Sequence, residues 1–215
     1  MNPWKTTLTI GCILLLFILS NCSSDKISLW NGTDFSGWKI VTADDSVDVN
    51  TVWSIKNGVI LCKGVPNGYM RTESEYSNYI LHLNWRWVEK ESNSGVFLHA
   101  QKPDQVWPKC IECQLHAGDA GDFILIGKGS ITVDEMKHEN TESYLMISKM
   151  QESSEKPAGE WNTYKIICEA NKITCYVNGV LQNKGSQASL DKGHIAIQSE
   201  GAPIEFKNIY LELLK

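Results

Sequence analysis

The chain has 215 residues, with 20 lysines and arginines against 25 aspartates and glutamates, which gives a net charge of −5. This acidic balance, with no basic patch, argues against nucleic acid as a partner. Eight tryptophans and seven tyrosines are many for this length. Such rings pack into cores, and they also stack on sugars, so the composition fits a globular domain with or without a sugar site.

The N-terminal segment has the pattern of a bacterial lipoprotein signal. Lys5 precedes an uncharged run over residues 8–19, which is too short to span a bilayer and is typical of the apolar part of a signal peptide. The run ends in Leu19-Ser20-Asn21-Cys22, which resembles a lipobox. We therefore expect cleavage before Cys22 and acylation of that cysteine, although an ordinary signal peptide with an incidental cysteine is the alternative.

This interpretation divides the chain into three parts. Residues 1–21 are the predicted signal peptide, 22–27 a short polar tether, and 28–215 a single domain. An acylated Cys22 holds a protein at a membrane surface without spanning it. The expected location is the cell envelope, on the periplasmic face of the outer membrane or at the cell surface, with lipid as the only contact to the membrane.

The predicted domain is a series of short strands separated by turns. Asn57-Gly58 and Asn178-Gly179 are hairpin signals, and no long stretch has helical periodicity. Strands are predicted over residues 52–60, 80–88, 95–100, 110–116, 144–147, 163–169, 173–178, 194–199 and 204–214. Their inward-facing residues should include Trp85, Ile111, Cys113, Ile166, Ile195 and Ile197. This pattern predicts an all-β sandwich or barrel.

Two segments are expected to be less regular than the rest, residues 118–132 and, apart from the strand predicted over 144–147, residues 134–159. A long segment of this kind is usually functional or a mobile lid. Cysteines at apolar positions of the predicted strands are expected to be small buried hydrophobes. They are Cys62, Cys113, Cys168 and Cys175.

Polar side chains share one face of several predicted strands. In Ile111-Glu112-Cys113-Gln114-Leu115-His116, strict alternation places the carboxylate, the amide and the imidazole on the same side. If the neighbouring strands follow the same rule, one face collects Asn84, Arg86, Phe97, His99, Glu112, Gln114, His116, Gln198 and Glu200. Side chains with directional hydrogen bonds and almost no lysine suit a hydroxyl-rich ligand. The alternative is a solvated sheet face with Arg–Glu pairs that contribute under about 1 kcal/mol each.

Other chemistries lack a motif. There is no Gly-x-Ser-x-Gly elbow and no glycine-rich phosphate loop. No cofactor is therefore expected. His99, Glu112 and His116 are the one candidate set for a divalent metal, but their spacing on strands is not diagnostic.

Several short motifs occur together in the order of one family. They are Leu29-Trp30-Asn31-Gly32-Thr33-Asp34-Phe35-Ser36-Gly37-Trp38, Trp53-Ser54-Ile55-Lys56-Asn57-Gly58-Val59, Asn93-Ser94-Gly95-Val96, Glu112-Cys113-Gln114, Pro157-Ala158-Gly159-Glu160-Trp161-Asn162, Asn178-Gly179 and the stretch from Gln198 to Asn208. With these motifs the chain resembles the bacterial 3-keto-α-glucoside 1,2-lyases and 3-keto-2-hydroxyglucal hydratases (3-keto-disaccharide hydrolases), many of which are lipoproteins. The resemblance implies a concanavalin A-like jelly roll, a sandwich of two antiparallel sheets of which one is concave.

The same resemblance implies a reaction. A 3-keto-glycoside would lose its C2 proton and then its C1 substituent by β-elimination, and water would add to the resulting 2-hydroxyglucal. A separate oxidoreductase would supply the keto-sugar. The alternatives are a lectin-like carbohydrate-binding module and a conventional glycoside hydrolase, which needs a carboxylate pair such as Glu112 and Glu200.

The expected roles in this reaction follow from the chemistry of each side chain. Glu112 is the expected base, with His116 or His99 as an alternative acid or base, and Arg86 is expected to stabilise the enolate. The remaining residues of the polar face are expected to bind the substrate, namely Asn84, Phe97, His99, Gln114, Gln198 and Glu200.

Overall fold

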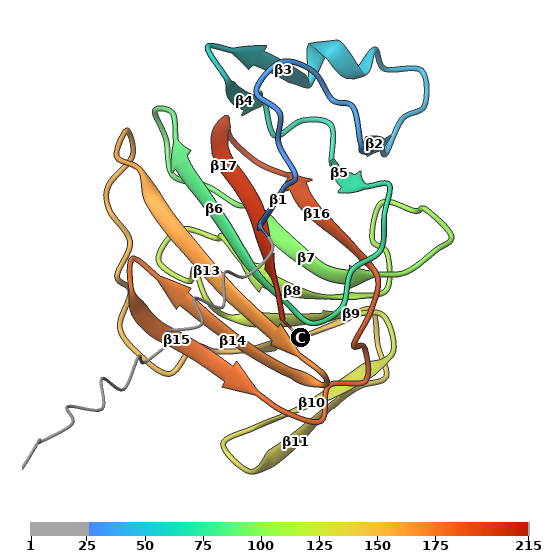
Figure 1. The fold of residues 1–215 in the computed structure, drawn as a ribbon, viewed down its shortest axis with the longest axis vertical. Coiled ribbons are helices and arrows are strands. Elements are labelled where there is room, and N and C mark those ends of the chain that lie inside the picture. The colour runs from blue at the N-terminus through green and yellow to red at the C-terminus, as the bar shows by residue number, and fades with distance from the viewer. Residues whose placement is uncertain (1–25, 215) are drawn as a thin grey trace, which may run out of the picture.

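Two antiparallel sheets packed face to face form the domain (Figure 1). The computed structural model describes residues 26–214, so the predicted signal peptide and Cys22 lie outside the described residues. The prediction of an all-β sandwich of two antiparallel sheets is confirmed. Within residues 26–214, no helix has the length and apolar character needed to cross a bilayer.

The eight-stranded sheet follows the order β15 (Val180–Gly185), β14 (Lys172–Val177), β13 (Asn162–Glu169), β6 (Tyr79–Trp87), β17 (Ile204–Leu213), β4 (Val59–Cys62) and β3 (Trp53–Lys56), with β1 (Lys26–Ser28) beside β17. The seven-stranded sheet follows the order β12 (Tyr144–Ile147), β9 (Phe123–Ile126), β8 (Cys110–Gln114), β7 (Gly95–Ala100), β16 (His194–Ser199), β5 (Gly68–Thr72) and β2 (Trp38–Thr42). A separate hairpin of β10 (Gly129–Val133) and β11 (Met136–Asn140) and the 3₁₀ turn η1 (Val49–Thr51) complete the described elements.

The core lies between the two sheets and is made by the inward face of each strand. β6 shows the rule best, because its residues alternate between buried and half-buried along all nine positions. All six residues predicted to be inward-facing are at most 1 % exposed, which confirms those core predictions: Trp85, Ile111, Cys113, Ile166, Ile195 and Ile197. The four cysteines expected to behave as buried hydrophobes are indeed buried and free.

Both predicted asparagine–glycine turns form hairpins. Asn57 and Gly58 join β3 to β4, and Asn178 and Gly179 join β14 to β15, each pair with positive φ at both positions. Positive φ at both central residues is the geometry that matches the twist of paired strands.

The segments expected to be irregular are partly strands. Residues 118–132 contain β9 and part of β10, and residues 134–159 contain β11 besides β12, which confirms the strand predicted over residues 144–147. β9 (Phe-Ile-Leu-Ile) has no apolar–polar alternation, because both of its faces are covered: Phe123 and Leu125 belong to the core, whereas Ile124 and Ile126 belong to a second apolar cluster. A strand buried on both faces reads as a continuous apolar run.

That second cluster covers the outer face of the seven-stranded sheet. It contains Tyr69, Phe97, Ala100, Cys110, Ile124, Ile126 and Ala196. The loop between β7 and β8, residues 101–109, is fastened beside it. Asp104 of this loop accepts two hydrogen bonds from the buried Arg71 of β5, at 2.7 Å from Nε and 2.9 Å from Nη2. A bidentate pair of this kind holds the loop in one geometry.

Candidate active site

A pocket of about 580 Å³ lies on the outer face of the seven-stranded sheet, and we call it the Glu112 pocket. Alternation along β8 turns Glu112 and Gln114 outward while Ile111 and Cys113 enter the core. The same rule on β16 turns Gln198 outward, and Glu200 follows directly after that strand. The pocket is lined by Asn93, Trp107, Glu112, Gln114, Ile124, Ile126, Ser143, Tyr144, Met146, Gln198 and Glu200.

The carboxyl group of Glu112 lies over a glycine of the neighbouring strand. A Cβ atom built on Gly95 of β7 would meet Glu112 Oε1 at 1.7 Å. No other amino acid fits at position 95 while Glu112 keeps this position, because real Cβ atoms do not approach an oxygen so closely. The glycine of the Asn93-Ser94-Gly95-Val96 motif therefore supplies the space in which the carboxyl group rests.

Burial changes the acidity of Glu112. Only 3 % of the residue is exposed, and this desolvation, with a smaller contribution from Glu200, raises the pKa of Glu112 to about 8. Removing water disfavours a carboxylate more than a neutral carboxylic acid. Glu112 is therefore mostly protonated at neutral pH, which suits a general acid better than the base expected from the sequence.

Glu200 has a different environment from Glu112. It is half-buried, and burial raises its pKa, but side-chain hydrogen bonds from Asn93 and Gln198 and the nearby His116 oppose this rise. Gln198 Nε2 donates to Glu200 Oε2 over 2.9 Å. Amide donors favour the ionised carboxylate. Burial thus raises the pKa of both carboxyl groups, but only Glu200 has hydrogen bonds that oppose the rise, and such a difference in environment is found at acid–base sites.

Three buried oxygen atoms in this pocket have no protein partner. Among the residues that the structure describes, no donor contacts Glu112 Oε1, Gln198 Oε1 or Asn93 Oδ1. An unsatisfied buried polar atom costs about 1–3 kcal/mol, so three in one pocket mark a place where a ligand can replace water. The two amide oxygens accept hydrogen bonds, whereas the Glu112 carboxyl group can also donate one when it is protonated, so together they suit the hydroxyl groups of a sugar.

His116 and Gln114 stand at the edge of the pocket. Gln114 Oε1 accepts hydrogen bonds from the backbone N–H groups of Leu115 and His116, at 2.9 and 3.0 Å, and so closes the turn after β8. His116 is exposed, and its Nδ1 lies 2.9 Å from Asp119 Oδ2. His116 does not line the pocket, but it lies close enough to Glu200 to lower the pKa of that carboxyl group electrostatically.

The expectation that Arg86 and Asn84 share a face with Glu112 is wrong. Both lie on β6 of the eight-stranded sheet and point away from the core, on the opposite side of the sandwich. Arg86 Nε donates to Glu205 Oε2 over 2.6 Å, and its guanidinium group lies 4.6 Å from the ring centre of Trp161. The strand pattern placed Arg86 on an outer face correctly, but it could not say which sheet the strand joins.

His99 and Phe97 also leave the pocket. His99 has φ +53° at a bulge, because β7 has one residue more than β16 between the pairs Phe97–Ala196 and Ala100–His194. The extra residue turns the imidazole toward Tyr79 of the core, with 5.7 Å between the ring centres. Phe97 does face outward, but it is fully buried against Tyr69 in the second apolar cluster.

With His99 turned inward, the candidate metal set of His99, Glu112 and His116 does not converge. Within the part of the chain that the structure describes, no group of three or more histidine, cysteine, aspartate or glutamate side chains is arranged to hold a metal ion.

Sequence reasoning missed the aromatic and apolar side of the pocket. Trp107, Tyr144 and Met146 are 41 %, 65 % and 56 % exposed, respectively, and all three line the pocket. Trp107 comes from the loop that Arg71 and Asp104 fasten. The signal available in the sequence was a tryptophan between two predicted strands and a tyrosine at the start of the strand predicted over residues 144–147. The structure shows that both side chains are exposed, and exposed apolar residues that lie together mark binding sites.

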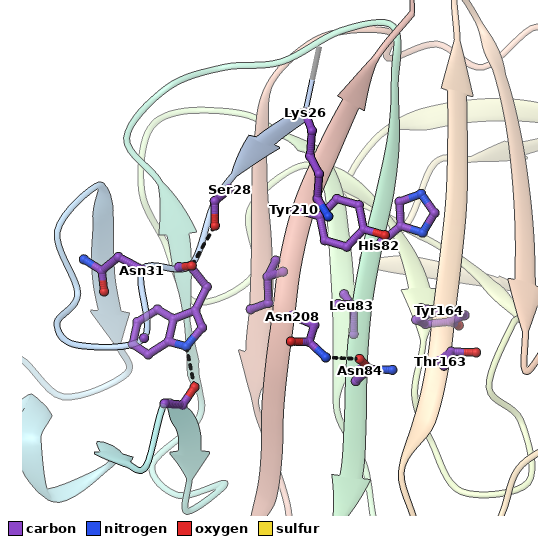
Figure 2. Close-up of a pocket in the computed structure, with 14 residues that line it drawn as sticks. Lys26, Ser28, Asn31, His82, Leu83, Asn84, Thr163, Tyr164, Asn208 and Tyr210 are labelled. Atoms are coloured by element: carbon purple, nitrogen blue, oxygen red, sulfur yellow. Dashed lines mark hydrogen bonds between the residues drawn. The ribbon is translucent and has the colours of Figure 1, made fainter. Parts of the chain in front are cut away.

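A second pocket, of about 560 Å³, lies on the outer face of the eight-stranded sheet, and we call it the Asn84 pocket. Figure 2 shows that its polar side chains face each other: Asn208 Nδ2 donates to Asn84 Oδ1 over 2.7 Å. The ring of Tyr210 lies between the Lys26 amino group and the ring of His82, which it stacks at 4.6 Å. His82 Nε2 in turn lies 3.3 Å from Glu212 Oε1. Among the described residues, one buried atom of this pocket, His82 Nε2, lacks a hydrogen-bond partner, against three in the Glu112 pocket, which is therefore the better candidate for binding a ligand.

The fold and the Glu112 pocket together define a two-sheet antiparallel β-sandwich with a partly polar pocket on one outer face. Residues 25–212 match the family described as the 3-keto-alpha-glucoside-1,2-lyase-like domain, and the chain belongs to this family. A comparison with curated proteins gives no match.

Solved structures with the same fold are numerous. A Parabacteroides distasonis protein provisionally named a glycosyl hydrolase is 24 % identical, with a TM-score of 0.65, over 88 % of this chain and 94 % of its own. The carbohydrate-binding module CBM66 from Bacillus subtilis is 12 % identical, with a TM-score of 0.59, over 80 % of this chain and 93 % of its own. The β-glucanase of Bacillus licheniformis is 13 % identical, with a TM-score of 0.57, over 91 % of this chain and all of its own. At these identities the similarity establishes the concanavalin A-like sandwich fold.

Gly95→Ala tests the packing of the carboxyl group. The new methyl group would occupy the position of Glu112 Oε1, so we expect a loss of about 1–3 kcal/mol of unfolding free energy from overpacking. In a Glu112→Ala background the same substitution should cost much less. A denaturant double-mutant cycle measures this coupling. Equal costs in the two backgrounds would show that Glu112 does not rest on Gly95.

Glu112→Gln tests the acidity of the buried carboxyl group. Folding raises its pKa from an ordinary value of 4.5 to about 8, so the native state holds the proton more tightly and wild-type stability falls as pH rises through this window. The variant lacks this penalty. The unfolding free energy of the variant minus that of the wild type should therefore increase between pH 5 and pH 8, by a maximum on the order of 4 kcal/mol. The exposed Glu142→Gln is the matched control, and a stability difference independent of pH would contradict the assignment.

Proposed function

We propose that the protein cleaves 3-keto-glycosides by proton abstraction at C2 and β-elimination at C1, and that it hydrates the 2-hydroxyglucal that results. The observation that carries this proposal is the pairing of a buried, protonated Glu112 with a hydrogen-bonded Glu200 in one pocket. Membership of the lyase-like family supports the same reaction class. The ketone would come from a separate oxidoreductase that oxidises the C3 hydroxyl group.

The reaction needs a base and an acid at the same time. The C3 carbonyl makes the C2 proton acidic because the electron pair left behind is delocalised onto the carbonyl oxygen. In the proposed mechanism Glu200 takes the C2 proton, the electron pair forms the C1–C2 double bond, and the C1–O bond breaks. Glu112 gives its proton to the departing oxygen. The products are the 2-hydroxyglucal ketone and the free aglycone alcohol, and addition of water in the reverse sense completes hydrolysis.

The elevated pKa of Glu112 fits the role of acid in this scheme. A carboxylic acid with a pKa near 8 remains protonated under physiological conditions and can still transfer its proton to an alkoxide. The amide of Gln198, which donates to Glu200 and leaves its own Oε1 without a partner, is suited to hold a sugar hydroxyl group beside the base.

Two alternatives use the same pocket. A conventional glycoside hydrolase also needs a protonated and an ionised carboxyl group, but its substrate is the unoxidised glycoside. A lectin-like module would bind a sugar through the same donors and acceptors without turnover.

The two carboxyl groups can be separated by experiment. Glu112→Gln should lower release of methanol from methyl 3-keto-glucoside by about 10²-fold or more, because methoxide is a poor leaving group that needs the acid. It should still exchange the C2 proton in heavy water, since Glu200 remains. Glu200→Gln should lose both. In the wild type, methanol release should decline as pH rises through about 8, as Glu112 loses its proton.

Each alternative gives a distinct outcome in the same assays. If Glu112→Gln loses C2 exchange while Glu200→Gln keeps it, Glu112 is the base. Cleavage of methyl glucoside, but not of its 3-keto form, would establish a conventional glycosidase. Sugar binding with neither exchange nor cleavage would establish a binding module.

We further propose that the chain is a lipoprotein of the cell envelope, anchored through Cys22. The support is the apolar run over residues 8–19 and the Leu19-Ser20-Asn21-Cys22 motif. Cys22→Ala should move the protein from the membrane fraction to the soluble fraction, because the acyl chains supply the membrane affinity. The matched control is Cys62→Ala, which alters a cysteine of the folded domain. A Cys22→Ala protein that stays in the membrane fraction would exclude the lipid anchor.

A further inference from the structure

The Glu112 pocket changes its chemistry from one strand to the next. In the sheet register, Glu112 of β8 pairs with Ile124 of β9, and Ile124 pairs with Met146 of β12. Because adjacent strands lie about 4.8 Å apart, Met146 is about 10 Å along this row from Glu112, roughly the width of one six-membered ring with its contacts. The row therefore begins at the proposed acid and continues over purely apolar side chains.

A parallel row reinforces the apolar side. Ile126 of β9 pairs with Tyr144 of β12, so two isoleucines form a floor and Tyr144 and Met146 border it on the edge strand. The loop that Arg71 and Asp104 fasten adds Trp107. Among the described residues, seven large hydrophobic side chains are exposed, and three of them line this one pocket. Such a concentration marks a binding surface, because single exposed hydrophobic residues are normally scattered.

A second sugar ring would be poorly accommodated on this side. Ile124 and Ile126 carry no hydrogen-bonding group and the Met146 thioether is only a weak acceptor, so hydroxyl groups pressed against them would lose water without gaining an adequate partner. An aromatic ring has no such loss, and it gains contacts with the apolar floor and with the rings of Tyr144 and Trp107.

We propose that the side of the pocket formed by Ile124, Ile126, Tyr144, Met146 and Trp107 is the subsite for the leaving group, and that it takes an aromatic aglycone rather than a second sugar. This inference rests on the proposed function, since it places the sugar beside Glu112 and Glu200 and the group leaving from C1 over the isoleucine floor. The natural substrates are then 3-keto-glycosides of aromatic alcohols or phenols.

Three substrates test the subsite, and two of them are matched in the acidity of the leaving group. Benzyl and methyl 3-keto-glucoside release alcohols of similar acidity, so a difference between them reports on contacts and not on bond cleavage. We expect KM for the benzyl compound to be about tenfold or more below that of the methyl compound, with similar kcat. The KM for a 3-keto-disaccharide should be similar to that for the methyl compound. A disaccharide KM at or below the benzyl value would overturn the proposal.

Variants on the edge strand locate the effect. Tyr144→Ser and Met146→Ser change exposed side chains and leave the core intact. Each should raise KM for the benzyl compound severalfold and leave KM for the methyl compound unchanged. Met136→Ser, which alters a similarly exposed methionine on β11 outside the pocket, is the control. An equal effect on both substrates would overturn the subsite.

The subsite can also be tested if the proposed chemistry fails. Titration calorimetry with unoxidised benzyl glucoside and methyl glucoside measures contacts without turnover. Tighter binding of the benzyl compound, lost in Met146→Ser but not in Met136→Ser, would support the subsite even if no 3-keto-glycoside were cleaved. Equal binding of the two glucosides would reject the subsite, whatever the enzyme assays show.

Discussion

The contact between the Glu112 carboxyl group and the bare backbone of Gly95 is the constraint on which the candidate site depends. Outward-facing carboxylates on a sheet are usually hydrated and ionised. Here Gly95 has no side chain, so the Glu112 carboxyl group packs directly against the backbone of the neighbouring strand, and only 3 % of the residue remains exposed. Burial then raises its pKa to about 8, so that the carboxyl group is mostly protonated at neutral pH.

The rest of the sheet keeps that carboxyl group in place and gives it a partner. β16 supplies Gln198, whose amide donates a hydrogen bond to Glu200, whereas Glu112 Oε1 has no partner among the described residues. Arg71 and Asp104 fasten the 101–109 loop beside the second apolar cluster, and the same loop carries Trp107 to the edge of the pocket. One outer face thus combines two carboxyl groups in different environments with an apolar surface within a few strands.

The parts of this arrangement that could be predicted from the sequence are the local ones. A period of two is a property of each strand by itself, so alternation correctly turned Glu112 and Gln198 outward and Trp85 inward. Which sheet a strand joins depends on pairing between distant segments. The same alternation on β6 therefore could not show that Arg86 lies on the other sheet from Glu112. The prediction that His99 faces the pocket was wrong for another reason. One extra residue in β7 forms a bulge that reverses the direction of the His99 side chain, and the composition of the strand does not reveal it.

The two outer faces show why an accumulation of polar residues is a weak sign of a site. The Asn84 pocket has amides, a histidine and a tyrosine that contact Asn208, Lys26 and Glu212, and one buried atom among them, His82 Nε2, lacks a hydrogen bond. The Glu112 pocket has fewer polar side chains, but three of its buried oxygen atoms lack a partner. Unsatisfied groups are costly to maintain, and a fold that keeps them together gains nothing from them until a ligand arrives. The difference in hydrogen-bond satisfaction, and not the number of polar groups, therefore distinguishes the candidate active site from the opposite face.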